Sequence, residues 1–355
     1  MTAAAIPRDV DPATDPAHLL ALLRGQCLQQ ASSVRHLSGE RDLNFLVEVA
    51  DSTARYVLKV SDARENPLSL SLQNAALEHL ALHAPQLPVQ RLRRWHDGSF
   101  MRALPGPQGE RWARVLAYLP GLPLYEAPPS AAQRRAIGAA LARLDLALAS
   151  LQEPVVGNEA LLWDIHRTPE LRSWLPAIQN AQSRVWADTV FARYEQEVQP
   201  VLSTLPQQFL HNDFNPYNLL VSPHQPDQVC GVLDFGDMVH GPRVFDAAVG
   251  ASYQAHAQHQ PSVQSFLEFM QGYQQVNPLS AQELQLLPLL AAVRCAMTLC
   301  ITEQRAEWFP ENRVYILRNH AVASAGLRAL MAAGLEPTVR HLLDNLQPQA
   351  QQPTS

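Results

Sequence analysis

Hydrophobic residues recur along this chain with two different spacings, and the first third differs from the rest. Near the amino terminus, apolar and polar residues alternate in short runs, which is typical of strands that bury one face. Residues 45–49 and 56–60 alternate on either side of the polar turn 51–54, so we expect a β-hairpin there. The elements expected in this part are helices at residues 16–29 and 70–83 and strands at residues 45–49, 56–60, 91–95 and 112–118.

From about residue 120 the apolar spacing becomes helical. In residues 131–151, for example, Ile137, Leu141, Leu144 and Leu148 fall on one side of a helix. We therefore expect an α+β fold, in which a small antiparallel sheet precedes a larger and mostly helical part. The further helices are expected at residues 186–205, 245–257, 263–276, 281–301 and 313–333.

The segment Leu119-Pro120-Gly121 interrupts both patterns and predicts a hinge between two lobes. A chain of 355 residues is long enough for two lobes with separate cores. We expect an amino-terminal lobe at residues 1–119 and a carboxyl-terminal lobe at residues 120–342. The remaining residues, 343–355, end in a run rich in Gln and Pro and are expected to form a disordered tail.

Composition indicates a globular protein, with 47% hydrophobic and 17% charged residues. A formal net charge of -6 provides no general attraction for nucleic acid or for an anionic membrane. The four cysteines lack C-x-x-C spacing, which suggests neither a zinc site nor a disulfide framework.

The placement of apolar residues bears on targeting and on membrane insertion. Residues 1–16 contain no apolar core of the signal-peptide type. The longest apolar stretch, at residues 286–301, is interrupted by Pro288 and Arg294, which favours a buried helix over a membrane span. We expect a cytoplasmic protein.

The most informative chemistry lies at residues 211–237. His211, Asp213 and Asn218 form an H-x-D-x-x-x-x-N pattern, and an apolar run ending at Asp234 begins a D-F-G motif. Kinase-type phosphotransferases use such a pair: one carboxylate deprotonates the acceptor hydroxyl, and oxygen ligands hold Mg²⁺ on the nucleotide. Aspartates also cap ordinary turns, but the presence of both motifs at this spacing favours phosphoryl transfer. We expect Asp213 to be the base and Asn218 and Asp234 to be metal ligands.

Lys59 supports the same interpretation independently. It is the only lysine among 27 basic residues, and it lies in the alternating segment 56–60. Kinases carry a phosphate-contacting lysine on a strand of this kind. A compact ammonium can contact both a phosphate and a carboxylate in a narrow site, where a planar guanidinium would not fit in the same way. The alternative is a surface lysine that is there by chance.

These motifs, in this order, resemble the aminoglycoside phosphotransferase and choline kinase superfamily, a small-molecule branch of the protein-kinase fold. Within it, the chain is most similar to the hydroxylysine kinases, and the similarity spans about residues 39–330. The closer resemblance is carried by Leu58-Lys59-Val60-Ser61, Gln73-Asn74, residues 115–123, residues 231–238 and Phe309-Pro310-Glu311-Asn312.

The resemblance implies a bilobal kinase-like fold and transfer of a nucleotide γ-phosphate to the hydroxyl of 5-hydroxylysine. Residues 1–119 are then expected to be the nucleotide-binding lobe and residues 120–342 the catalytic and substrate lobe. GTP is the donor associated with that family, so GTP or ATP is expected, together with Mg²⁺. Asp213 is then the base and Lys59 the phosphate contact. Tyr118, in the hinge segment, is expected at the nucleotide, and His211 is expected to pack the loop.

Two parts of the kinase pattern are altered. Protein kinases pair the lysine with a helix glutamate, but the corresponding position here falls at Ser71. Either Glu78, on the same helix, reaches Lys59, or another group orients the lysine. The segment expected to cover the phosphates, residues 38–44, has one glycine and lacks the G-x-G-x-x-G pattern. Either Ser38 and backbone amides cover the phosphates there, or the segment is an ordinary loop.

The acceptor site needs arginine and acidic or aromatic partners if the substrate is an amino acid. Arg294 lies within an apolar helix, where an unpaired cation is costly; it either contacts a substrate carboxylate or pairs with Glu303 or Asp246. Asp237 is expected to face the same site as Asp234, and Glu303 is a further candidate for lining it. Trp163 and Trp308 are candidates too, although core packing is the better expectation for them.

Three functional hypotheses follow. The first is a hydroxylysine-type amino-acid kinase. The second is a kinase for an aminoglycoside, homoserine, choline or ethanolamine; an aminoglycoside enzyme is expected to carry a strongly acidic acceptor site. The third, from another class, is a nucleotide-binding pseudokinase, which the presence of Lys59, Asp213, Asn218 and Asp234 disfavours. For the two enzyme hypotheses the expected partners are a nucleotide and a small-molecule substrate, whereas a pseudokinase would act through a further partner.

Overall fold

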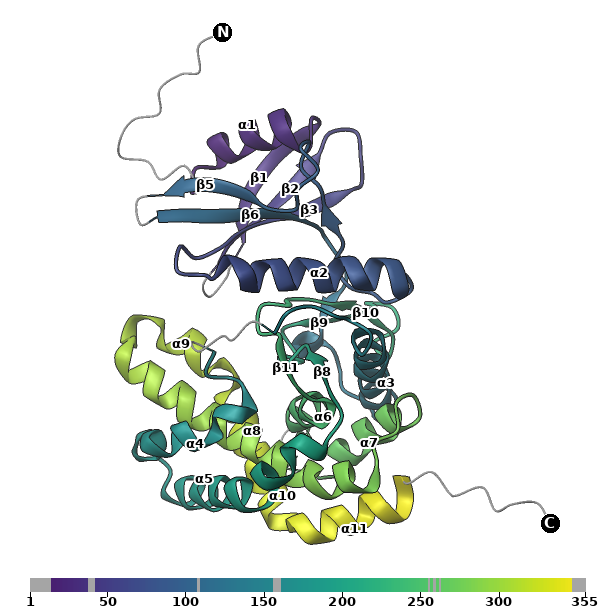
Figure 1. Ribbon diagram of the computed structural model, residues 1–355, viewed down its shortest axis with the longest axis vertical. Coiled ribbons are helices and arrows are strands. Elements are labelled where there is room, and N and C mark those ends of the chain that lie inside the picture. Colours follow the sequence, from purple (N-terminus) through teal and green to yellow (C-terminus); the bar gives the residue numbers. More distant parts are fainter. Residues whose placement is uncertain are drawn as a thin grey trace, which may run out of the picture. The chain divides into compact units, whose positions relative to one another are not determined.

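The computed structural model describes residues 14–37, 42–106, 109–155, 161–254, 256–257, 260–261 and 263–346. The chain divides into two compact units, Met1–Pro120 and Gly121–Ser355. The first unit consists of an antiparallel sheet with two helices, and the second is mostly helical (Figure 1). The α+β class expected from the sequence is confirmed.

The sheet of the first unit has the strand order β1-β2-β3-β6-β4, with β5 also paired to β6. The expected hairpin is present as β2 and β3, in which Phe45 lies opposite Leu58. The strands are β1 (Ala31–Leu37), β2 (Leu43–Val49), β3 (Arg55–Val60), β4 (Leu92–Arg93), β5 (Arg102–Gly106) and β6 (Gly109–Ala117).

The helices α1 (Pro16–Gln26) and α2 (Pro67–His83) pack on opposite faces of this sheet (Figure 1). Leu19 and Leu23 of α1 join a buried apolar cluster that includes Leu58 and Val60 of β3. Because side chains alternate along a strand, Lys59 points to the other face. Arg114, which lies opposite Lys59 on β6, donates to Asn74 of α2 at 3.3 Å on that side.

Two strands of the first unit were not expected. β1 carries Ser32, Ser33, Arg35 and His36, and most of its residues are partly exposed, because it forms the edge of the sheet. β5 contains Pro105, which edge positions tolerate since no ladder hydrogen bond from its nitrogen is needed. Edge strands bury too little surface to show a clear apolar alternation.

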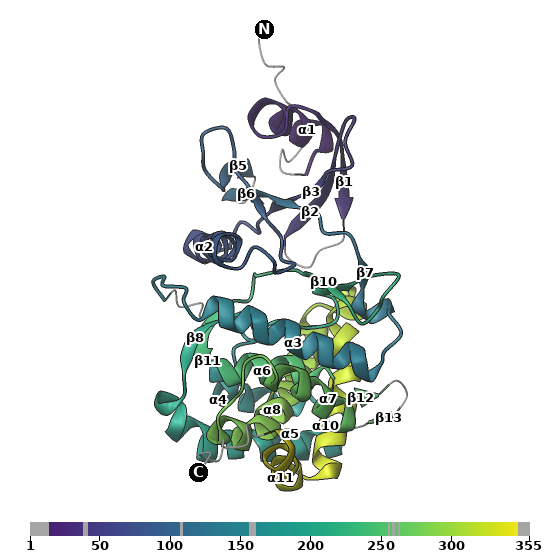
Figure 2. The same cartoon turned by 90° about the vertical axis from the view of Figure 1, so that its right-hand side faces the viewer.

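The second unit is built around α8 (Ala281–Trp308), a helix of 28 residues whose middle is almost entirely buried. Ser280 and Glu283 form a capping box at its start, which satisfies backbone amides that have no partner within the helix. Figure 2 shows α8 among the other helices of this unit. The helices are α3 (Ala131–Leu148), α4 (Thr168–Leu171), α5 (Ala181–Arg193), α6 (Arg243–Ser252), α7 (Val263–Gln274), α9 (Arg313–Ile316), α10 (His320–Ala333) and α11 (Leu335–Leu346).

By length and composition, α8 is the one helix in the described part of the chain that is apolar enough to cross a membrane. However, 89% of its most apolar window is buried inside the protein. Its apolar surface is therefore used for packing within the second unit, as the sequence predicted for residues 286–301.

Some expected boundaries in the second unit are wrong. The tail was expected from residue 343, but α11 continues to Leu346 and buries Leu342, so residues 343–346 belong to a packed helix; residues 347–355 lie outside the described residues. Of the helix expected at residues 186–205, only the part up to Arg193 is α-helical. Residues 194–204 form π and 3-10 turns instead. The helix expected at residues 313–333 is divided into α9, a 3-10 turn and α10.

Candidate active site

Two pairs of short strands in the second unit bring the two sequence motifs together. β8 (Gln207–Leu210) pairs with β11 (Val239–Pro242), and between them β9 (Leu219–Val221) pairs with β10 (Val229–Val232). The loop 211–218 leaves β8 and enters β9, while residues 233–238 leave β10 and enter β11. Because the pairs are nested, the two loops lie side by side, and the Leu233 amide donates to the Asn218 carbonyl at 2.8 Å.

His211 fills the space between these loops. Its side chain is fully buried, and its ring makes edge contacts with Phe214 and Phe235, with centroids 5.9 and 4.9 Å away. Its Nε2 lies 3.0 Å from the Leu233 carbonyl oxygen. His211 therefore packs the first loop against the second, which is the structural role expected from the resemblance.

Asp246 on α6 fastens the start of the first loop. Its Oδ2 accepts from the His211 amide at 2.7 Å and its Oδ1 from the Asn212 amide at 2.8 Å. Asn212 adopts a φ of 62°, which asparagine tolerates better than most residues. The sequence considered Asp246 only as a partner for Arg294; the signal for its actual contacts was one acidic residue inside the otherwise apolar helix start Val244-Phe245-Asp246-Ala247.

Asp213 lies at the centre of the first loop with its side chain 21% exposed. Its Oδ2 accepts from Asn218 at 2.6 Å and its Oδ1 from Asn215 at 2.8 Å. Burial raises the pKa of Asp213 to about 6, and the nearby Asp234 adds to the rise, while Arg294 and the Asn215 hydrogen bond oppose it. A carboxylate of this kind is ionised at neutral pH and can accept a proton.

Asn218 and Asp234 present oxygen atoms of the kind that Mg²⁺ prefers. The Asn218 amide nitrogen donates to the Oδ2 and the carbonyl oxygen of Asp213, and its own side-chain oxygen accepts no hydrogen bond from the described residues. Asp234 is exposed and has a left-handed backbone with φ 57°. The described residues contain no cluster of three His, Cys, Asp or Glu side chains suited to a metal. An ion held here would complete its shell with phosphate or water oxygens.

Arg294 reaches this site from the middle of α8, where its side chain is 1% exposed. It donates to the Trp163 carbonyl at 2.6 Å, lies 5.1 Å from the Trp163 ring, and is 3.8 Å from Asp213 Oδ1. Burial by itself lowers the pKa of Arg294, but the neighbouring Tyr253, Asp213 and Asp237 raise it overall. Of the partners left open by the sequence, neither Glu303 nor Asp246 forms the ion pair; the carboxylate is that of Asp213.

Glu303 does not line this site. Its Oε2 accepts from the Gln179 amide at 2.8 Å, and its Oε1 lies 2.8 Å from Nε2 of His320. Glu303 thus ties α8 to the segment before α5 and to the start of α10. Core packing was also wrong for Trp308, which is 53% exposed and contacts Trp174 edge-on; Trp163 is half-buried.

Asp237 lies close enough to Arg294 to affect its pKa, and its backbone carbonyl accepts from Asn212 at 3.1 Å. It is therefore in the same region as Asp213. The sequence missed Arg318 and Tyr217 in this region. Arg318 opposes the rise in the Asp213 pKa, and its guanidinium lies 4.8 Å from the Tyr217 ring.

In the first unit, Lys59 forms an ion pair with Asp42, with 3.3 Å between Nζ and Oδ2. Glu78 instead pairs with Arg94. The sequence had left Glu78 or another group open as the partner of Lys59, and the structure places Asp42 there. Asp42 immediately precedes β2 and gave no pattern from which this contact was predicted.

The two remaining expected nucleotide residues are also in the first unit. Tyr118 follows β6, and the Arg55 guanidinium lies 4.2 Å from its ring. Ser38 lies outside the described residues, as does most of the loop expected to cover the phosphates.

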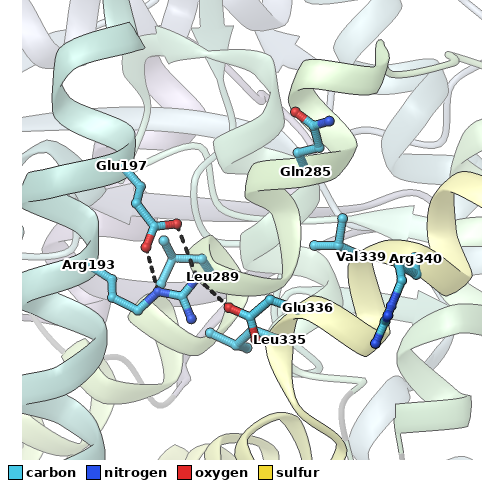
Figure 3. A pocket seen from close by; sticks show the side chains of 8 residues that line it. All are labelled: Arg193, Glu197, Gln285, Leu289, Leu335, Glu336, Val339 and Arg340. Atoms are coloured by element: carbon cyan, nitrogen blue, oxygen red, sulfur yellow. Dashed lines mark hydrogen bonds and ion pairs between the residues drawn. The ribbon is translucent and has the colours of Figure 1, made fainter.

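A pocket elsewhere in the second unit contains none of these residues. It has a volume of about 380 Å³, and Figure 3 shows Arg193 within it, directed toward both Glu197 and Glu336. The distances from Arg193 to these carboxylates are 2.6 and 2.9 Å. Arg193 is therefore already paired within the protein.

Comparisons with known proteins agree with this geometry. A model of the phosphotransferase enzyme family matches residues 33–284, well over half of the chain. The chain belongs to this family. It is an enzyme that transfers a phosphoryl group to a hydroxyl group of a small molecule.

Curated relatives extend over most of this phosphotransferase. A hydroxylysine kinase of Mus musculus is 29% identical over 325 residues, which cover 86% of each chain. A homoserine kinase of Azorhizobium caulinodans is 27% identical over 264 residues, covering 71% of this chain and 74% of the relative.

Solved structures share the fold at lower identity. A microcompartment-associated aminopropanol kinase has a TM-score of 0.69 and 18% identity, covering 88% of this chain and 95% of its own. An amicoumacin kinase has a TM-score of 0.64 and 15% identity, with 86% and 93% covered.

Proposed function

We propose that this phosphotransferase moves the γ-phosphate of GTP or ATP to the side-chain hydroxyl of an amino acid, with 5-hydroxy-L-lysine as the first candidate. The observation that carries the proposal is the setting of Asp213. It is a carboxylate with a pKa of about 6, oriented by two asparagines and paired with a buried arginine. Such a group is ionised at neutral pH and suited to accept the proton of a hydroxyl.

The reaction we infer is a direct in-line transfer. The acceptor oxygen forms a bond to the γ-phosphorus as the bond to the β–γ bridging oxygen breaks, and the hydroxyl proton passes to Asp213. Asn218 and Asp234 would hold Mg²⁺, which neutralises charge on the phosphates when bound. Lys59 is proposed to contact the same phosphates. The nucleoside diphosphate leaves without a phosphoenzyme.

The acceptor class is inferred from the relatives and from charge. Hydroxylysine kinases and homoserine kinases are both named for amino acids that carry a side-chain hydroxyl. The positive charges of Arg294 and Arg318 both act on Asp213. Aminoglycosides, choline and ethanolamine carry no carboxylate that could pair with these arginines. We therefore place homoserine second and the acceptors without a carboxylate last.

The test measures nucleoside diphosphate release with Mg²⁺, using GTP and ATP in parallel. The acceptors are 5-hydroxy-L-lysine, L-homoserine, ethanolamine and an aminoglycoside, each run with the wild type, with Asp213→Ala and with Asp188→Asn. Asp188 is a surface residue paired with Arg172 and serves as the control. We expect release that depends on hydroxylysine, falls at least about a hundredfold in Asp213→Ala, and is unchanged in Asp188→Asn.

Nucleotide binding distinguishes the alternatives. It is expected to survive in Asp213→Ala, because the substitution removes the base and not the expected phosphate contacts. Loss of nucleotide binding together with activity would make Asp213 structural. Turnover only with ethanolamine or the aminoglycoside would overturn the amino-acid proposal, and nucleotide binding without turnover on any acceptor would favour a pseudokinase.

A further inference from the structure

Arg318 lies in a 3-10 turn, Leu317–Asn319, between α9 and α10. Its guanidinium lies over two tyrosine rings, 4.0 Å from the centroid of Tyr315 and 4.8 Å from that of Tyr217. Tyr217 belongs to the loop that carries Asp213 and stacks in turn on Tyr125, with centroids 4.5 Å apart. Two ring faces thus position a cation beside the candidate active site.

This arginine has no anionic partner in the part of the chain that the structure describes. Neither an ion pair nor a hydrogen bond from its guanidinium is found among the described residues, although its charge acts on Asp213. The side chain is half-buried. Aromatic faces hold a guanidinium without using its N–H donors, so the donors stay available for an anion that arrives from outside.

The position of Arg318 limits which anion that is. Arg294 already provides the ion pair to Asp213, so Arg318 is not needed to balance that carboxylate. Arg318 is nevertheless near enough to influence Asp213 electrostatically. The guanidinium contacts Tyr217 of the loop that carries Asp213, so an anion bound to Arg318 lies near the carboxylate that receives the hydroxyl proton. An amino acid with a side-chain hydroxyl has this arrangement, with a carboxylate a few bonds from the reacting oxygen.

We propose that Arg318 binds the carboxylate of the acceptor amino acid and so makes the enzyme select acceptors that carry one. The planar guanidinium matches a carboxylate with two parallel hydrogen bonds. Tyr315 and Tyr217 keep it oriented, and the link through Tyr217 couples a bound carboxylate to the loop of Asp213. The inference rests on the proposed amino-acid kinase function and names the group that recognises its substrate.

The experiment compares acceptors with and without a carboxylate. The enzyme is assayed with 5-hydroxy-L-lysine and with the diamine that remains when its carboxylate is removed, in the wild type, Arg318→Gln, Arg318→Lys and Arg313→Gln. Arg313 is exposed on α9 and is the matched control. Thermal unfolding of each variant verifies folding, and Arg318→Lys keeps the charge while losing the planar fork.

We expect Arg318→Gln to raise the KM for hydroxylysine by about tenfold to a hundredfold, with kcat changed much less. The KM of Arg318→Lys for hydroxylysine is expected to lie between those of Arg318→Gln and the wild type. For the diamine, kcat/KM is expected to be already low in the wild type and unaffected by either substitution. The KM for the nucleotide is expected to stay the same in every variant, and Arg313→Gln is expected to behave as the wild type.

Four results would overturn the inference. Equal effects of Arg318→Gln on hydroxylysine and on the diamine would mean that the residue does not recognise the carboxylate. A raised KM for the nucleotide instead would assign Arg318 to a donor phosphate. Turnover of hydroxylysine with an unchanged KM would reject this inference alone, whereas no turnover of any amino acid would reject the proposed function with it.

Discussion

At the scale of single residues, the carboxyl group of Asp145 interacts with that of Asp246, the residue that holds the start of the loop of Asp213. Asp145 on α3 is fully buried and accepts from the Tyr273 hydroxyl at 2.6 Å. Burial raises the pKa of Asp145 well above its usual range, and the negative charge of Asp246 raises it further, against the effects of Tyr273 and Arg243. Because its pKa is raised well above the usual range, Asp145 holds a proton in the folded protein.

This proton gives a prediction about stability and pH. The folded chain holds a proton on Asp145 in a pH range where the unfolded chain has lost it, so stability falls as pH rises above the unfolded pKa of about 3.9 toward the raised folded pKa. The slope from this group is at most about 1.4 kcal/mol per pH unit. Asp145→Asn removes the titration and keeps a neutral side chain that can accept from Tyr273.

Urea unfolding of the wild type and of Asp145→Asn between pH 5 and 8 measures this effect. We expect the variant to gain stability relative to the wild type as pH rises, while Asp188→Asn at an exposed ion pair shows no such trend. A variant that is weaker than the wild type by the same amount at every pH would mean that Asp145 is ionised and usefully paired.

At the scale of elements, two glycines allow α3 and α7 to pack closely beside the catalytic loop. A Cβ atom on Gly138 of α3 would overlap the Phe269 carbonyl, and one on Gly272 of α7 would overlap the Arg135 carbonyl. Neither obstacle is a flexible side-chain end, so one helix would have to move. Asp145 lies on α3 and Tyr273 on α7, so the distance between the two helices affects the hydrogen bond that joins these side chains.

We predict that Gly138→Ala and Gly272→Ala each lower the free energy of unfolding by about 1–3 kcal/mol. Gly25→Ala in α1 is the matched control, because nothing lies within 4 Å of its added Cβ. Replacing that glycine in a helix is expected to stabilise by up to about 1 kcal/mol. Thermal unfolding of the three variants measures these changes in stability. If Gly138→Ala and Gly272→Ala were both as stable as the wild type, the close contact between α3 and α7 would be contradicted.

At the scale of the whole molecule, two units with separate cores contribute different chemistry. The second unit contains Asp213, Asn218 and Asp234, while the first contains Lys59, held by Asp42 at 3.3 Å. The ion pair fixes the ammonium on the sheet face opposite the α1 core. We therefore expect the first unit to contribute to donor binding and not to the proton transfer.

Lys59→Ala tests this division. We expect the KM for GTP or ATP to rise about tenfold or more, while the KM for the acceptor changes little. Arg64→Ala, at a side chain that is 88% exposed, is the control and is expected to leave both constants unchanged. Unchanged kcat/KM in Lys59→Ala would show that the only lysine of this chain is incidental.

The sequence by itself determined the parts of the protein that depend on local spacing. The hairpin with Lys59, the amphipathic α3 and the buried α8 follow from apolar periodicity, and the loop of Asp213 and Asn218 follows from residues five positions apart. β1 escaped prediction because it is an exposed edge strand with little apolar alternation. α11 was missed although its apolar residues fall on one side of the helix.

Only the tertiary structure decided which distant residues complete the site. Arg294 meets Asp213 because the middle of α8 passes behind the loop, Asp42 meets Lys59 across a strand start, and Arg318 is held by rings from two separate segments. In each case the charged group is paired or positioned by a residue far away in sequence, and the desolvation of a partly buried charge requires such a partner. Periodicity and motif spacing report the neighbours within an element, whereas the partner of a buried charge depends on how the elements pack.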